Sequence, residues 1–205
     1  MAVANVLGEY SSEHFNALLP LDDALDPYRR AGGDAFVQDV FRKFFVQAGM
    51  DKTFGLALMH RHFPIDLNQK LVEYNGTSTA WIEDGKFPVR PHLWSFDDGG
   101  LLRPTEFTYP KRADDGSTFG YKELGFLFKL LKKLEEYGLS KTLGIALYPG
   151  DDFAGTCEIT QGEANINLHP DDVRPRTYRS KSAADVCSGL PICSTFRLYI
   201  ISPRH

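Results

Sequence analysis

The chain has few cysteines, no long apolar run and no basic leader segment. Only 3 of its 205 residues are cysteine, and so small an odd number does not form a disulfide framework. No segment approaches the roughly 20 apolar residues that span a bilayer. The N-terminus lacks the basic and apolar regions of a secretory signal. These absences predict a cytoplasmic protein without a membrane partner.

The chain also lacks a basic surface and the common catalytic motifs. Its formal net charge is -4, and the basic run "KLLKK" at 129–133 is followed, after Leu134, by Glu135 and Glu136. Nucleic-acid binding normally requires a sustained basic face. The sequence contains no glycine-rich phosphate loop, no G-x-S-x-G turn and no H-E-x-x-H helix. We therefore expect a small-molecule ligand rather than a nucleic acid.

Apolar residues, by contrast, are plentiful: 42% of the chain is hydrophobic and 13% aromatic, enough for one core in a single domain, 1–205. Apolar spacing predicts helices over 34–48 and 121–137, which end at Gly49 and Gly138. A short helix is expected near 12–19, followed by an irregular acidic segment. The other apolar segments predict strands, at 54–59, 69–74, 93–96, 106–109, 142–148, 156–160, 164–168 and 194–201. The predicted fold class is α+β, with an antiparallel sheet or sheets and two main packed helices.

Two segments of the chain resemble each other. "GMDKTFGLALM" (49–59) and "GLSKTLGIALY" (138–148) are identical at six of eleven positions. Each follows a predicted helix, and each precedes a strand that carries one glutamate, Glu73 or Glu158. The order predicts a duplicated helix–strand–strand unit with pseudo-twofold symmetry. The units would span 33–80 and 120–169, joined by a connector at 81–119 that is rich in aromatic residues, proline and glycine.

The two copies differ where the shared strand ends: the first continues as "HRHF" and the second as "PGDDF". Alternate residues of a strand share a face, so His60 and His62 would continue the face of Leu56 and Leu58, about 6.5 to 7 Å apart. Two imidazoles at that spacing can bind one metal ion or act as an acid–base pair. The alternative is that both histidines are only hydrogen-bonded at a strand end. Arg61, on the opposite face, is expected in a surface ion pair.

Other polar and aromatic residues could complete a site. Glu73 is the preferred third ligand and catalytic helper, because a neighbouring strand of a hairpin could bring it beside the histidines. Glu158, its counterpart in the second copy, is another candidate ligand and could meet Glu73 across the pseudo-twofold axis. His92 and Trp94 could contact a cofactor in a pocket, and His169, before a proline, is expected to be a turn residue.

The leading interpretation is a protein that acts on or binds an apolar or aromatic small molecule. It would be a metal-dependent enzyme that uses His60, His62 and Glu73 with a divalent transition metal such as zinc, iron or copper. The alternatives are a non-catalytic carrier of haem or another hydrophobic ligand, and a protein-interaction module without an active site. Aromatic side chains of the connector are expected to make the ligand cleft apolar: Trp81, Phe87, Trp94, Phe96, Phe107 and Tyr109.

Overall fold

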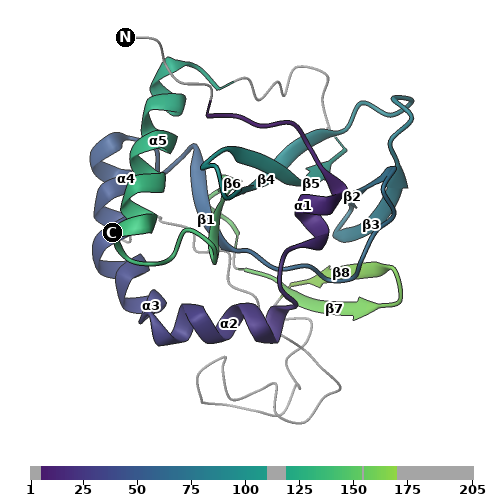
Figure 1. The fold of residues 1–205 in the computed structure, drawn as a ribbon, viewed down its shortest axis with the longest axis horizontal. Helices are drawn as coiled ribbons and strands as arrows, with labels where there is room; N and C mark the ends of the chain where they lie inside the picture. Colours follow the sequence, from purple (N-terminus) through teal and green to yellow (C-terminus); the bar gives the residue numbers. More distant parts are fainter. Residues whose placement is uncertain (1–5, 110–118, 154, 170–205) are drawn as a thin grey trace.

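The computed structural model describes residues 6–109, 119–153 and 155–169, and its centre is one eight-stranded sheet (Figure 1). The strand order is β1-β6-β4-β5-β2-β3-β8-β7, and every neighbouring pair is antiparallel except β2 and β5. The prediction of an α+β fold with a mainly antiparallel sheet is confirmed. The strands are β1 (Phe54–Leu58), β2 (Gln69–Tyr74), β3 (Thr77–Ile82), β4 (Arg90–Phe96), β5 (Leu102–Thr108), β6 (Leu143–Leu147), β7 (Cys157–Gln161) and β8 (Ala164–Leu168).

The N-terminal part contains more helix than the sequence predicts. Helix α1 (Ser12–Asn16) begins where the Ser11 side chain accepts a hydrogen bond from the backbone of His14. Helix α2 (Leu21–Arg30) occupies the segment that was expected to be irregular, so that prediction is wrong. Pro27 lies inside α2 and removes one backbone hydrogen bond, but the helix still forms because its inner face buries Ala24 and Tyr28.

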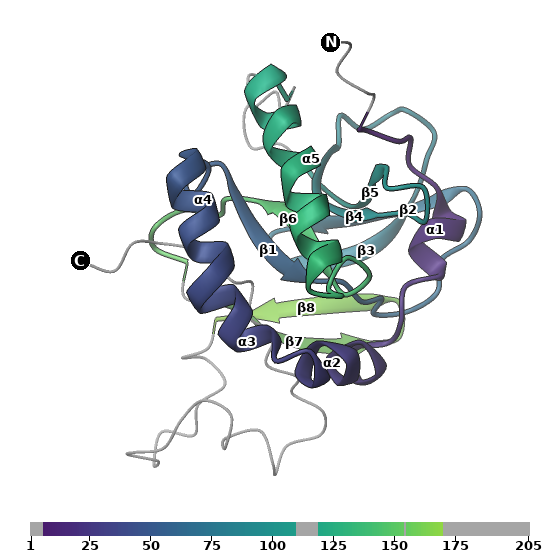
Figure 2. The ribbon, with the colours of Figure 1, turned by 60° about the vertical axis from the view of Figure 1, so that its left-hand side comes forward.

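The predicted helix at 34–48 is a continuous helical run in three parts. It comprises α3 (Gly33–Phe36), a π-helical turn (Val37–Phe41) and α4 (Arg42–Ala48), and it ends at Gly49 with φ of 61°. Helix α5 (Tyr121–Glu136) lies beside α4 over β1 and β6 (Figures 1 and 2). Helix α1 lies where a short helix is predicted, but α2 is a further helix of ten residues, so the prediction of two main helices is not confirmed.

The main core fills the space between these helices and the sheet. Phe126 of α5 stacks on Phe44 of α4, with ring centroids 5.2 Å apart. Leu56 of the edge strand β1 and Ile145 of its neighbour β6 are both fully buried under the helices. A smaller cluster around Phe15 packs under α1. Among the described helices none has both the length and the apolar run needed to cross a bilayer.

The two similar segments lie next to each other as β1 and β6. Leu56 pairs with Ile145, the residue with which it also aligns in sequence. Each strand follows a glycine with positive φ, Gly49 or Gly138. β1 and β6 therefore pair antiparallel about this central pair of aligned residues.

Backbone hydrogen bonds at the ends of this pair repeat the same relation. Met59 N donates to Thr142 O (2.8 Å), and Tyr148 N, which aligns with Met59, donates to Thr53 O (3.0 Å). β4 and β5, from the segment that was expected to be a connector, lie between β6 and β2 in the sheet. The remaining strands of the two units are thus separated from β1 and β6. The predicted strand at 194–201 lies outside the described residues.

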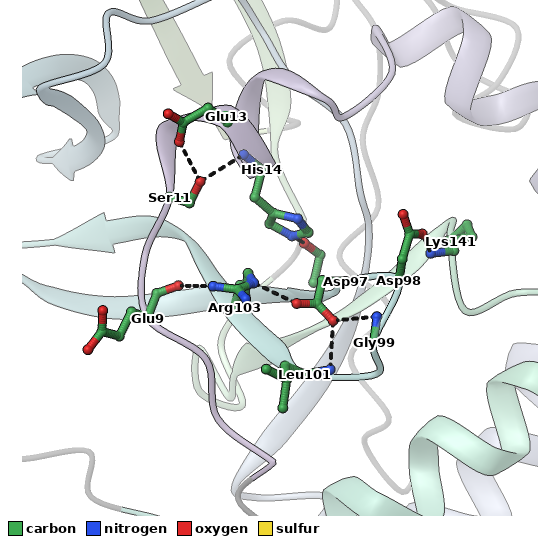
Figure 3. Close-up of polar contacts among 11 residues, drawn as sticks. Glu9, Ser11, Glu13, His14, Asp97, Asp98, Gly99, Leu101, Arg103 and Lys141 are labelled. Atoms are coloured by element: carbon green, nitrogen blue, oxygen red, sulfur yellow. Dashed lines mark hydrogen bonds and ion pairs between the residues drawn. The ribbon is translucent and has the colours of Figure 1, made fainter.

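A polar network fastens the N-terminal segment to the hairpin of β4 and β5 (Figure 3). His14 Nε2 lies 2.6 Å from the hydroxyl oxygen of the buried Ser95. Burial lowers the pKa of His14, which keeps its imidazole neutral. Arg103 donates from Nε to Asp97 (2.6 Å) and from Nη1 to the carbonyl of Glu9 (3.0 Å). These contacts hold α1 against the sheet and account for the half-buried His14 without a ligand.

Candidate metal centre

The two histidines of the HRH segment lie just beyond the end of β1 and face inward. The strand ends at Leu58, and the side chains of both His60 and His62 are 5% exposed. Their ring centroids are 4.6 Å apart and the rings are nearly perpendicular. Leu56 lies in the core under the helices, whereas the histidines line a cavity. Leu58, which belongs to the same core as Leu56, also lines this cavity beside both histidines.

Arg61 anchors the segment between the two histidines. Its backbone N–H donates to the carbonyl of Leu19 (2.9 Å), and its guanidinium donates to the carbonyl of Asn16. The described contacts of Arg61 are therefore hydrogen bonds to the end of α1 and its loop, not the surface ion pair that was predicted. Because Arg61 points toward α1 and the loop after it, the side chains of His60 and His62 point the opposite way, into the cavity.

Glu158 of β7 completes a group of three possible metal ligands with His60 and His62. Its Oε2 lies 3.2 Å from His60 Nε2 and 3.9 Å from His62 Nδ1. One donor atom from each residue lies within 4.8 Å of the other two. The Glu158 side chain is only 9% exposed. Two imidazoles and one carboxylate thus converge in a buried position.

Hydrogen bonds to the other ring nitrogens indicate which atoms face the centre of this group. His60 Nδ1 lies 3.1 Å from the carbonyl oxygen of Leu58, which can only accept a hydrogen bond, so Nδ1 is the donor in this contact. His60 Nε2 is then the ring nitrogen that faces Glu158, at hydrogen-bond distance from its Oε2. His62 has the opposite orientation, with Nε2 3.6 Å from Oε1 of Glu106 and Nδ1 toward Glu158.

Glu106 of β5 is a second buried carboxylate beside the group. Burial raises its pKa, but the hydrogen bond and charge of His62 and the nearby His92 and His60 outweigh burial, and the pKa is lowered overall. Burial likewise lowers the pKa of His62, yet Glu106 and Glu158 outweigh that effect and raise it. The raised pKa favours the protonated form of His62, whose positive charge would balance part of the negative charge of Glu106 and Glu158 when no cation is bound.

A cavity of about 330 Å³ opens beside the three-residue group. Its polar side chains include His92, Glu73 and Asn167 as well as the group itself. None of the connector aromatics named above is among its lining residues, so the expected source of an apolar wall is wrong. The apolar wall comes instead from aliphatic residues, proline and one phenylalanine: Ala57, Leu58, Leu93, Ala146, Leu147, Pro149 and Phe153.

The other candidates from the sequence take different places. Glu73 lines the cavity, but its carboxylate accepts hydrogen bonds from Gly76 N (2.7 Å) and Thr108 Oγ1 (3.1 Å). Trp94 is buried in the main core and is not among the residues that line the cavity. The exposed His169 is not among them either.

Glu106 is the functional candidate that sequence reasoning missed. It lies in the strand "LRPTEFT", and its side chain is 12% exposed. A single glutamate in an apolar strand gives no sign of its contacts, since His62 lies 44 positions away in the sequence. The repeat pattern did mark Glu158, as the counterpart of Glu73.

Comparisons with models of known protein families, with curated protein sequences and with solved structures found no match to this chain. The function must therefore be inferred from the geometry and chemistry of the site.

Proposed function

We propose that the chain binds one divalent transition-metal ion through His60 Nε2, His62 Nδ1 and a carboxylate oxygen of Glu158. The observation that carries this proposal is the convergence of three buried ligand atoms within 4.8 Å. Buried carboxylates and imidazoles are costly unless they are paired or bind a cation. Glu106 would accept the Nε2–H of His62 and so orient its ring, as outer carboxylates commonly do for metal-binding histidines.

The distances suit such an ion. Ligand atoms bind zinc at about 2.0 to 2.2 Å and are therefore about 3 to 3.5 Å apart around it. The distance of 3.2 Å between His60 Nε2 and Glu158 already fits, and the distance of 3.9 Å from His62 Nδ1 needs only a small side-chain rotation. Two histidines with one carboxylate form catalytic zinc sites and mononuclear iron(II) sites. Copper is a third candidate for the same ligands.

The cavity beside the three ligands supports an enzyme that acts on a small molecule. Three protein ligands leave coordination positions for a substrate or water, whereas structural zinc sites usually have four protein ligands. The ion would act as a Lewis acid on a polar atom of the bound molecule. A haem carrier is less well supported, because haem iron takes one or two axial side chains rather than three convergent ones. We also propose that the two helix–strand–strand units arose by duplication and that the protein is cytoplasmic.

Metal analysis of the purified full chain tests the proposal. We expect about one zinc or iron ion per chain after loading and removal of excess metal. Glu158→Gln keeps the shape of the side chain but removes its charge, and we expect it to lower metal affinity by more than the roughly 10–100-fold typical of outer ligands. Glu163→Gln is the matched control, because Glu163 is an exposed glutamate in the turn between β7 and β8. Cobalt(II) absorption would report the ligand geometry.

A chain that binds no metal, or binds it equally well in both variants, would contradict the proposal. Two ions per chain would instead point to a second site at Glu106 and His92.

A further inference from the structure

The cavity beside the candidate metal ligands has an unusual charge balance. Of the described residues that line it, three are glutamate, three are histidine and none is lysine or arginine. A single divalent ion would not neutralise three carboxylates. With the ion bound, a negatively charged ligand would thus enter a site of net negative charge without a lysine or arginine partner, and its desolvation would be poorly compensated.

Carboxylates also restrict the kind of hydrogen bond that a ligand can make. Ionised glutamate side chains only accept hydrogen bonds. The Glu73 carboxylate already accepts two from the protein, whereas Glu106 Oε1 and Oε2 face His62 and His92 at 3.6 and 3.9 Å. The distance from Glu106 to His92 is longer than a good hydrogen bond. This end of the cavity therefore has acceptor capacity for a ligand that brings a donor.

A β-bulge places His92 in the cavity wall. In the pairing of β4 with β5, Pro91 lies opposite Phe107 and Leu93 opposite Glu106, so His92 is an extra residue without a partner across the ladder. Consecutive residues of a regular strand point to opposite faces. Here His92 and Leu93 both line the cavity. Bulges often redirect a side chain next to an active site.

A ligand in the cavity could reach only the part of the His92 ring away from Nδ1. Its Nδ1 atom is buried, while the side chain as a whole is 27% exposed, so the exposure lies on the rest of the ring. Burial lowers the pKa of His92 in spite of the opposing charges of Glu106 and Glu73, and Arg90 lowers it further. A neutral imidazole at this position can donate or accept a hydrogen bond without adding charge.

We propose that the cavity binds a small molecule with an apolar body and an uncharged or cationic hydrogen-bond donor group, such as an alcohol or an amine. His92 and Glu106 bind this donor group. Anions are excluded. The inference rests on the proposed function for the role of the ion. The aliphatic wall, with Phe153, would cover the apolar body. The bulge at His92 makes this residue a determinant of specificity rather than a metal ligand.

Three probes with the same ring and different charge test the inference: benzyl alcohol, benzylamine and benzoate. Their affinities would be measured by calorimetry or NMR on the full chain, both metal-free and loaded with zinc. We expect the alcohol or the amine to bind at least about tenfold more tightly than benzoate, a difference of about 1.4 kcal/mol. His92→Leu should remove most of this preference while leaving zinc affinity within a fewfold of wild type.

His169→Leu is the matched control, because it removes a histidine that does not line the cavity. If His92→Leu fails to fold, His92→Phe would replace it, since phenylalanine keeps a planar ring but cannot form the proposed hydrogen bond. Benzoate binding as tightly as the other probes, no probe binding at millimolar concentration, or an unchanged preference in the His92 variant would overturn the inference. Selective binding to a chain that takes up no metal would support it while contradicting the proposed function.

Discussion

The ends of β1 and β6 carry the same kinds of polar group in opposite surroundings. Beyond β1, His60 faces Glu158, and their side chains are 5% and 9% exposed. Beyond β6, Asp151 pairs with Lys52 and the hydroxyl of Tyr148, and the lysine and aspartate side chains are 49% and 68% exposed. An exposed ion pair gains and costs little, because water screens it. A buried pair carries a large desolvation penalty. A bound cation at the end of β1 could therefore compensate more of this penalty than one at the end of β6.

The largest expected effect comes from breaking the buried pair. In metal-free protein, His60→Leu leaves the Glu158 carboxylate buried against an apolar side chain, and we expect a loss of about 3 kcal/mol in the free energy of unfolding. Lys52→Leu makes the same change at the exposed end and should leave stability unchanged within error. Chemical denaturation at neutral pH measures both.

The double variant His60→Leu/Glu158→Leu sharpens this test. Replacing both partners of a buried pair by apolar residues is often neutral or stabilising, so most of the lost stability should return. Equal destabilisation by His60→Leu and Lys52→Leu would contradict the distinction between the two ends.

The next effect concerns the scaffold that the two strands share. An added Cβ at Gly144 of β6 would lie 2.2 Å from both the Met59 sulfur and the Trp94 carbonyl oxygen. The carbonyl belongs to the neighbouring strand and cannot move away without disturbing the sheet. We expect Gly144→Ala to destabilise the chain by about 1–3 kcal/mol, measured by thermal unfolding.

Gly125→Ala in α5 is the control for this change. The added Cβ would meet nothing within 4 Å, and alanine favours a helix interior, so we expect a gain of about 0.5–1 kcal/mol. If both variants were destabilised alike, the close approach at Gly144 would not be the cause.

Local sequence signals predicted much of this scaffold. Both helix ends at Gly49 and Gly138, and the strands that follow them, were predicted because apolar periodicity and a glycine with positive φ act within a few residues. Helix α2 was missed because Pro27 is usually a sign of irregular structure. β3 was missed because "TSTAWI" shows no clear alternation of apolar and polar residues.

The candidate site could be predicted only in part, because its members come from distant strands. The sequence placed His60 and His62 together, since they are two residues apart. The sequence favours Glu73 over Glu158, because a hairpin is the simplest way to bring a carboxylate to the end of a neighbouring strand. The order of the sheet decides otherwise: β7, at the far edge, brings Glu158 within 3.2 Å of a histidine 98 positions away. Strand order at that range leaves no local signal.

A smaller effect is expected at Asp97, which lies between the two extremes of exposure. Burial raises its pKa, but Arg103 and the backbone N–H groups of Leu101 and Gly99 outweigh burial and lower it overall. A lowered pKa adds stability above the ordinary value of about 4 that is lost as the pH falls through the folded value. We expect Asp97→Asn to cost about 1 kcal/mol at pH 7, since the pair is partly open to solvent.

Denaturation of both proteins from pH 7 down to pH 2 checks the sign of this effect. The difference between wild type and Asp97→Asn should be constant above pH 5 and shrink below about pH 4. A difference that grew on acidification would mean that another group is responsible.

The smallest effect is expected from Asp151→Asn at the exposed end of β6. The pKa of Asp151 is lowered by its hydrogen bonds to Lys52 and Tyr148, but all three side chains lie at the surface. At physiological salt, where charges are screened over about 8 Å, we expect no measurable change in Tm or in metal affinity. At low salt a small loss of Tm should emerge. If Asp151→Asn lowered metal affinity as Glu158→Gln is expected to do, burial would not distinguish the two strand ends, and the carboxylates of both would belong to one site.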